Sequence, residues 1–228
     1  MNLFYYRNRV TFILSFSLLL STFSLTGCID LAVNQSRHSQ ASLKLTRYSK
    51  GEIYTMRGGL GGVFSKGMNH LEDTLADEYG VHAYSTVWFK ARALSDSLIK
   101  RYATKQIHGP IILVGHSLGA NDQIAVARNL ARANVPVALL ITIDAVLPLG
   151  ISSNVQQALN IYKPSFVPMF SGFSLSADNP KLTHVENFNV NKAKGIAVNH
   201  FTIDKDKTVQ RLMLDRILAT LKAANKAS

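Results

Sequence analysis

Residues 110–120 read Pro-Ile-Ile-Leu-Val-Gly-His-Ser-Leu-Gly-Ala, and this stretch decides the fold class. The run from Pro110 to Gly115 is apolar throughout, which is typical of a strand buried on both faces of a parallel sheet. Residues 118–134 follow at once and are rich in alanine, which favours a helix. Ser117 stands between the two segments, and the glycine on either side of it permits a tight turn. The stretch therefore predicts a strand, a sharp turn that carries a serine, and a helix.

The same alternation of apolar runs and amphipathic segments continues on both sides of this stretch. We expect strands over residues 53–56, 81–88, 110–115 and 137–143, and helices over residues 65–79, 91–105, 118–134 and 204–224. Strands that alternate with helices imply an α/β fold, in which a mostly parallel sheet carries helices on both faces. Residues 148–200 break the rhythm because they hold four of the six prolines. Within them we expect short strands at 160–166 and 184–190, and a small excursion over the site.

A bare Gly-x-Ser-x-Gly turn is common by chance, but Gly-His-Ser-Leu-Gly after Ile-Ile-Leu-Val is much more specific. The stretch resembles the nucleophile elbow of the α/β-hydrolase superfamily, especially its lipase- and thioesterase-like members. The resemblance covers most of residues 52–224 by element order, and only the elbow by sequence. It implies an α/β-hydrolase fold and a serine hydrolase with Ser117 as the nucleophile, acting as an esterase, lipase or thioesterase.

The superfamily orders its catalytic residues as serine, then Asp or Glu, then histidine. Asp144 directly follows the apolar run 137–143, so the resemblance implies that it is the acid. Asp178, in a later loop, is the alternative. His200 lies in the loop before the last expected helix and is the implied base, with His184 as its alternative. In this scheme His200 would take a proton from Ser117, while Asp144 would fix the imidazole tautomer.

An oxyanion hole needs two N–H donors. The first is expected from the backbone of Leu118, directly after the serine. The second is expected from the glycine-rich residues 57–62, Arg-Gly-Gly-Leu-Gly-Gly, where both Gly59 and Leu60 remain candidates. A phosphate-binding loop is the rival interpretation, and it fails because no Gly-Lys-Ser/Thr follows. Neither metal-ligand spacing nor a dinucleotide fingerprint occurs, so we expect no cofactor and no metal.

The first 27 residues are typical of a signal peptide, with Arg7 and Arg9 ahead of an apolar stretch over residues 10–20. The Leu-Thr-Gly-Cys that ends at Cys28, the only cysteine, resembles a bacterial lipobox, in which the cysteine is lipid-modified. A plain secretory signal with an unused thiol is the alternative. The resemblance implies an anchored envelope protein, and Ile29 rather than Asp after the cysteine favours the outer membrane. Residues 28–50 are then a tether, and residues 51–228 the hydrolase domain.

Charge and aromatic content leave the substrate open. The net charge of +11 allows attraction to anionic lipid, although an ordinary basic surface also accounts for it, and no Lys/Arg run indicates nucleic acid. Five aromatic residues could line an acyl pocket or simply fill the core: Phe64, Trp88, Phe166, Phe170 and Phe173. A small-molecule or lipid acyl substrate is expected. The alternatives are a catalytically inactive binding lipoprotein and an amidase or peptidase on the same fold.

Overall fold

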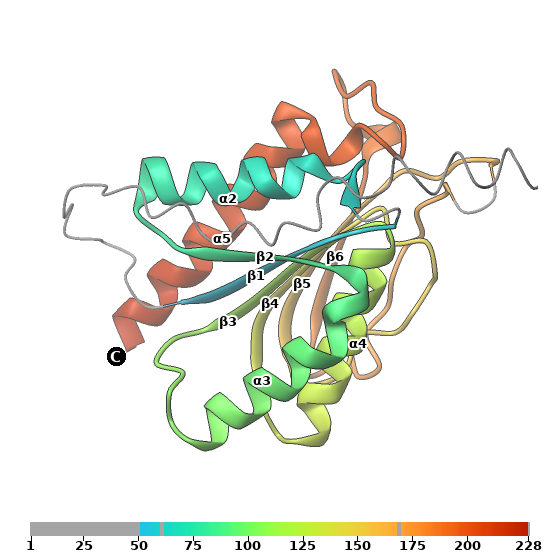
Figure 1. The fold of residues 1–228 in the computed structure, drawn as a ribbon. Helices are drawn as coiled ribbons and strands as arrows, with labels where there is room; N and C mark the ends of the chain where they lie inside the picture. The colour runs from blue at the N-terminus through green and yellow to red at the C-terminus, as the bar shows by residue number, and fades with distance from the viewer. Residues whose placement is uncertain (1–50, 60–61, 168–169, 228) are drawn as a thin grey trace, which may run out of the picture. The chain divides into compact units, whose positions relative to one another are not determined.

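The computed structural model describes residues 51–59, 62–167 and 170–227. Six strands form one sheet in which every neighbouring pair is parallel, in the order β2-β1-β3-β4-β5-β6 (Figure 1). Because all strands point the same way, their carboxyl ends lie at one edge of the sheet. The strands are β1 (Glu52–Arg57), β2 (Ala83–Val87), β3 (Ile111–His116), β4 (Val137–Ile143), β5 (Val155–Tyr162) and β6 (His184–Asn189).

Helices cover both faces of the sheet (Figure 1). They are α2 (Lys66–Tyr79), α3 (Ala91–Ala103), α4 (Leu118–Arg132) and α5 (Lys207–Ala227), with 3-10 turns η2 (Trp88–Lys90), η3 (Val190–Lys192) and η4 (Ile203–Lys205). Alternate side chains of β3 point to opposite faces of the sheet, and each face has its own core cluster. Ile112 and Val114 pack in the cluster with α2 and α5. Ile111 and Leu113 pack in the second cluster, with α3 and α4. The predicted fold class, parallel α/β with helices on both faces, is confirmed.

The prediction for residues 148–200 needs one correction. We expected a strand at 160–166, but the strand in the structure is β5, which starts five residues earlier, at Val155, and ends at Tyr162. It pairs with both β4 and β6. Gln156 and Gln157 are exposed and break the apolar pattern at its start, while Pro164 follows its end. The strand expected at 184–190 is confirmed as β6. The excursion over the site is therefore shorter than expected, and the loop after β5 supplies it.

Several predicted features lie outside the described residues: the signal peptide, Cys28, Ile29, the tether and Leu60. Among the helices that the structure describes, none combines the length and the apolar character that a membrane crossing requires.

Candidate active site

The turn after β3 has the strained geometry that the sequence predicts. Ser117 precedes α4 with φ 60° and ψ −128°, a region of backbone space that residues other than glycine rarely occupy. A Cβ at Gly115 would overlap the carbonyl oxygen of Gly119, and a Cβ at Gly119 would overlap that of Met56. The two glycines therefore allow α4 to start directly against β1 and β3. The Ser117 N–H donates to the Ile143 carbonyl at 2.9 Å, which fixes the turn to β4.

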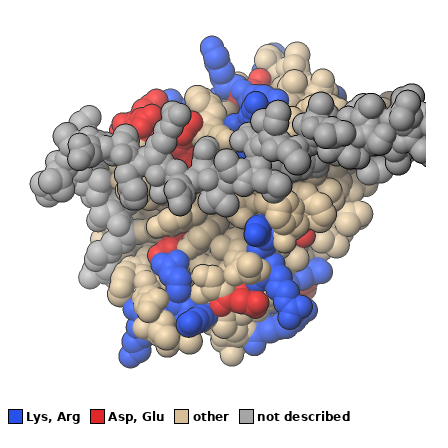
Figure 2. Space-filling view, viewed as in Figure 1, with Lys and Arg blue, Asp and Glu red and all other residues tan. Residues whose placement is uncertain are grey.

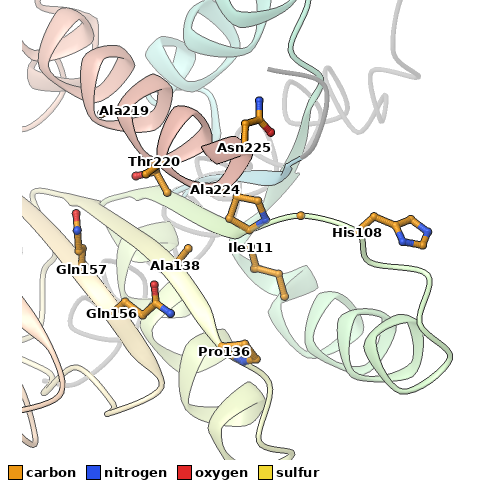
Figure 3. Close-up of a pocket in the computed structure, with 13 residues that line it drawn as sticks. His108, Ile111, Pro136, Ala138, Gln156, Gln157, Ala219, Thr220, Ala224 and Asn225 are labelled. Carbon is orange, nitrogen blue, oxygen red and sulfur yellow. The ribbon is translucent and has the colours of Figure 1, made fainter. Parts of the chain in front are cut away.

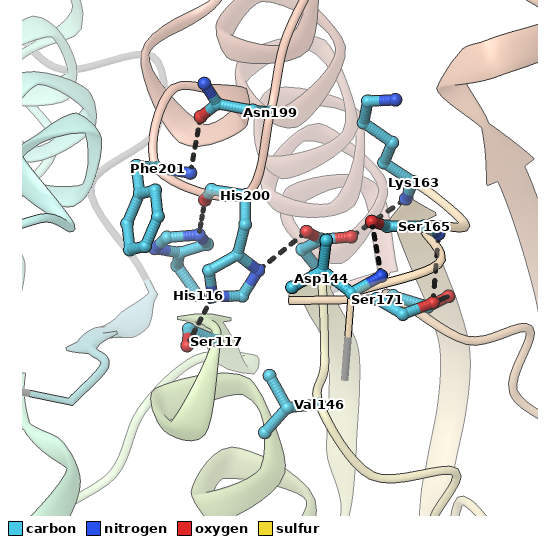
Figure 4. Close-up of polar contacts among 12 residues, drawn as sticks. His116, Ser117, Asp144, Val146, Lys163, Ser165, Ser171, Asn199, His200 and Phe201 are labelled. Carbon is cyan, nitrogen blue, oxygen red and sulfur yellow. Dashed lines mark hydrogen bonds and ion pairs between the residues drawn. The ribbon is translucent and has the colours of Figure 1, made fainter. Parts of the chain in front are cut away.

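The structure brings the serine, the histidine and the acid into one hydrogen-bonded chain (Figure 4). Ser117 Oγ lies 2.9 Å from His200 Nε2, and His200 Nδ1 lies 2.7 Å from Asp144 Oδ2. Since a carboxylate only accepts, Nδ1 carries the proton in the neutral ring, and Nε2 is free to accept from the serine hydroxyl. Ser117 follows β3 and Asp144 follows the adjacent β4, so parallel pairing places both at the same edge. His200 reaches them from the loop before η4.

Asp144 is held from two sides. Its side chain is fully buried, and its Oδ1 accepts the Lys163 N–H at 2.8 Å (Figure 4). Gly172 passes so close that a Cβ there would overlap Oδ1. The backbone of Asp144 also has a positive φ of 50°. The loop after β5 therefore fixes the carboxylate, and the sequence held no signal for either of these loop contacts.

A second histidine, His116, links the site to the loop after β1. Its Nε2 lies 2.9 Å from the His200 carbonyl oxygen, so Nε2 carries the proton, and its Nδ1 accepts from the Ser65 hydroxyl at 2.8 Å. Ser65 Oγ in turn accepts the Gly58 N–H at 3.0 Å. One neutral imidazole thus connects the backbone of His200 to the loop beside Ser117. From its position next to the serine, the sequence indicated only that His116 could shape the site, and neither of its hydrogen bonds was predicted.

Burial lowers the pKa of His116 to about 3, and the nearby His200 adds to the shift. The unfolded chain therefore binds one more proton than the folded chain between about pH 6.5 and pH 3, and stability falls as pH falls through this window. Burial also raises the pKa of Glu72 to about 7 and that of Asp204 to about 6. These two carboxyl groups have the opposite effect on stability, since each adds stability as pH falls. The contribution of His116 is therefore isolated by comparing variants.

We expect the stability advantage of the natural chain over His116→Gln to shrink by about 1.4 kcal/mol for each pH unit below about 6.5. Urea unfolding at pH 7, 5 and 4 measures this difference. His82→Gln, at an exposed position, is the matched control and should show no such trend. A difference for His116→Gln that stays constant with pH would contradict the assignment of a neutral buried ring.

The glycine-rich loop after β1 lies against the serine. A Cβ at Gly58 would lie 2.7 Å from Ser117 Cβ, and a Cβ at Gly59 would lie 3.1 Å from Leu118 Cδ1. The structure therefore places Gly59 beside the side chain of Leu118. These two residues are the candidate oxyanion donors that lie within the described residues. The N–H of Gly58 is already bonded to Ser65, which leaves the N–H groups of the following residues as the ones that could meet a ligand.

The alternative acid and base lie elsewhere. Asp178 is on an exposed loop, 3.9 Å from Arg128, and its N–H donates to the Ile151 carbonyl. His184 is exposed and begins β6, so it stands at the amino-end edge of the sheet, opposite the serine. Within the described residues, no three His, Cys, Asp or Glu side chains gather where they could hold a metal ion.

A cavity of about 590 Å³ lies at that opposite edge (Figure 3). It opens between the amino ends of β3, β4 and β5 and the last turns of α5, and its lining includes Pro110, Ile111, Pro136, Gln157 and Thr220. None of the residues that line it belongs to the hydrogen-bonded chain described above. The chemistry of Ser117 is therefore to be sought at the carboxyl-end edge, not in this cavity.

Comparisons with known proteins give weak likenesses in fold. No family model matches the chain, and no curated protein matches it in sequence. A hyperthermophilic esterase from the archaeon Pyrobaculum calidifontis has a TM-score of 0.49 at 13% identity, covering 78% of this chain and 78% of the esterase. The RedJ thioesterase of the prodiginine pathway of Streptomyces coelicolor has a TM-score of 0.43 at 14% identity, covering 74% and 88%. The type II thioesterase BorB of the borrelidin cluster has a TM-score of 0.44 at 13% identity, covering 75% and 93%. At such similarity, an activity has to be argued from the side chains of the site.

Proposed function

We propose that this chain is a serine hydrolase that cleaves an acyl ester or thioester through Ser117, His200 and Asp144. The observation that carries the proposal is the continuous chain of hydrogen bonds from the Ser117 hydroxyl through the His200 ring to a buried carboxylate. A histidine held in this tautomer can act as a general base towards the serine and then as a general acid towards the leaving group. No other residue type in the site is needed for the two steps.

In the first step, Ser117 Oγ attacks the acyl carbonyl while His200 Nε2 takes the hydroxyl proton. Asp144 stabilises the imidazolium that forms, because its carboxylate is fully buried and 2.7 Å from Nδ1. His200 then gives the proton to the leaving alcohol or thiol, and the bond between carbonyl carbon and leaving group breaks. Water, activated by the same histidine, releases the acid from the acyl-enzyme.

The oxyanion that forms at the carbonyl requires N–H donors beside Ser117. We assign the first to Leu118, at the start of α4, where the helix dipole adds a favourable field. We assign the second to the loop after β1, and favour Gly59 because it contacts the Leu118 side chain and the neighbouring Gly58 N–H is already bonded to Ser65. Leu60 stays the alternative donor.

Gly58→Ala tests this assignment without replacing any of the three reacting side chains. The added methyl would lie 2.7 Å from Ser117 Cβ and 2.8 Å from the His116 carbonyl, so the loop has to shift. We expect kcat to fall about 10²-fold or more, with a smaller change in KM, because the donor would be lost mainly in the transition state. Steady-state kinetics on a soluble acyl ester measure the two constants. Ser97→Ala, at an exposed position of α3, is the control. An effect on KM alone for Gly58→Ala would contradict the assignment.

A fluorophosphonate probe tests the proposal as a whole. Such probes phosphonylate an activated serine, so the purified chain should be labelled, and peptide mass spectrometry should place the label on Ser117. Labelling that survives in Ser117→Ala would sink the proposal. A chain that takes no label would favour the catalytically inactive binding protein. A panel of acyl esters, thioesters and amides then separates the esterase from the amidase or peptidase.

We also propose that Cys28 is lipid-modified and that the protein is anchored in the bacterial envelope, with the outer membrane favoured by Ile29. Its support is the sequence around Cys28 alone. Bacteria fed an alkyne fatty acid should label the natural chain, and Cys28→Ser should lose the label and leave the membrane fraction. Ser117→Ala should keep the label, which excludes a trapped acyl-enzyme as its source. A label that persists in Cys28→Ser would contradict the anchor.

A further inference from the structure

The exposed apolar side chains of the described residues gather at one edge of the sheet. Of the thirteen large hydrophobic residues with high exposure, ten lie in the segments that leave the carboxyl ends of β1 to β5. The three others, Tyr84, Tyr102 and Leu182, lie on a strand, at the end of α3 and just before β6. We call this surface the apolar rim; its members include Phe64, Trp88, Leu118, Leu147, Phe166 and Phe170. Large exposed apolar surfaces of this kind mark contact with a protein or a membrane.

The apolar rim is continuous with the proposed catalytic histidine. The ring of Phe201 lies 5.0 Å from that of Phe64 and 5.0 Å from that of Phe170, between centroids. Phe170 in turn lies 5.4 Å from the His200 ring. Phe166, four residues before Phe170, is fully exposed. The five aromatic residues whose place the sequence left open are therefore exposed and not buried core. Among them, Phe170 contacts the His200 ring, and Phe64 is linked to it through Phe201.

Positive charge lies at the same edge of the sheet as the apolar rim. Six lysines lie in the segments that leave the carboxyl ends of β1, β2, β5 and β6: Lys66, Lys90, Lys163, Lys192, Lys194 and Lys205. No ion pair within 4.0 Å involves any of them in the part of the chain that the structure describes. Lys163 and Lys205 donate to neutral oxygens, Asn191 Oδ1 and the Phe201 carbonyl.

Acidic groups at this edge are few. Asp144 and Asp204 are fully buried, and the partly exposed Asp206 caps α5 by accepting from Thr208 and Val209. The face in Figure 2 shows Lys and Arg scattered, with Asp and Glu among them. The edge around Ser117 therefore combines exposed aromatic residues with an excess of lysine.

We propose that the apolar rim docks onto an anionic lipid surface, from which Ser117 takes its acyl substrate. Aromatic side chains settle at the level of the headgroups, and each lysine near anionic lipid strengthens binding about fivefold. A rigid protein seated on the apolar rim would cover Ser117, whereas a lipid layer would bring acyl chains to it. The substrate part of this proposal rests on the proposed hydrolase function; the docking does not.

Trp88, the one tryptophan of the chain, is a built-in reporter of docking, because it lies on the apolar rim. The full chain carrying Ser117→Ala, which removes hydrolysis, is bound to vesicles whose acyl chains carry bromine, a quencher on contact. We expect strong quenching of Trp88 in vesicles made of equal parts phosphatidylglycerol and phosphatidylcholine, and weak quenching in phosphatidylcholine alone. Equal quenching in both would overturn the anionic preference, and none in either would overturn lipid docking.

Matched variants locate the docking surface. Lys192→Gln with Lys194→Gln should lower the ratio of docked to undocked protein about fivefold per charge, and Phe166→Ser about tenfold. The controls lie at the opposite edge: Lys222→Gln with Lys226→Gln near the end of α5, and Leu182→Ser. Equal losses in variants and controls would overturn the assignment to the apolar rim. Because fluorophosphonate labelling of the natural chain needs no vesicles, failure of the hydrolase proposal is read separately.

Discussion

Replacing Ser117 by alanine is expected to lower kcat/KM for a soluble acyl ester about 10⁶-fold. In the proposed mechanism the Ser117 hydroxyl forms the acyl-enzyme, and without it His200 has no proton to take from a nucleophile. Residual turnover should come only from the oxyanion donors and from substrate binding. The release of p-nitrophenol from p-nitrophenyl butyrate by purified protein measures the loss.

The fold should survive this substitution, because alanine at position 117 adopts the same strained backbone conformation, with φ 60°, as serine does. Circular dichroism and the thermal midpoint should therefore stay close to those of the natural chain. Ser97→Ala, on the exposed face of α3, is the matched control and should keep full activity. If Ser117→Ala retained activity within tenfold of the natural chain, another nucleophile would have to be sought.

Asp144→Asn is expected to lower kcat about 10⁴-fold. The carboxylate accepts on both oxygens, from His200 Nδ1 and from the Lys163 N–H. An asparagine has one acceptor and one donor, so one of these contacts has to face an N–H group. If the amide nitrogen faces Nδ1, the ring proton moves to Nε2, and His200 can no longer accept from Ser117. If it faces Lys163 instead, two donors meet in a fully buried place, which costs stability.

The two outcomes for Asp144→Asn are separated by measuring kcat together with the free energy of unfolding in urea. A large loss of kcat with normal stability indicates the wrong tautomer, and a loss of both indicates the clash at Lys163. Asp178→Asn is the control, since its carboxylate lies beside Arg128 on an exposed loop. Should Asp178→Asn prove the more damaging of the two, the assignment of the acid to Asp144 would be wrong.

The sequence predicted what depends on local pattern. The apolar runs that became β3 and β4 could be located because both strands are buried on both faces, and Ser117 and Asp144 follow directly from their ends. β5 was misplaced because Gln156 and Gln157 are exposed at its start and conceal its apolar half. Burial pattern is thus a sound guide for central strands and a poor one where a strand end faces solvent.

The contacts that hold the site together could not be predicted in the same way. His116 and Ser65 are 51 residues apart, and their hydrogen bond exists only because β1 and β3 are neighbours in the sheet. Gly172 could not be linked to Asp144, since the approach depends on how the loop after β5 turns back. The exposure of Phe166 could not be predicted either, because an aromatic residue in a sequence is as compatible with the core as with the surface.

The hydrogen bonds of the site also have a kinetic consequence. His200 is 83 residues from Ser117 and 56 from Asp144, and β4 has to pair with β3 before the serine and the acid share an edge. Contacts this distant in sequence form late and slow the folding of a domain. Reactivity of Ser117 towards a fluorophosphonate should therefore appear after helical structure during refolding. The labelling rate of Ser117 would then report on the last stage of folding, with no added probe in the chain.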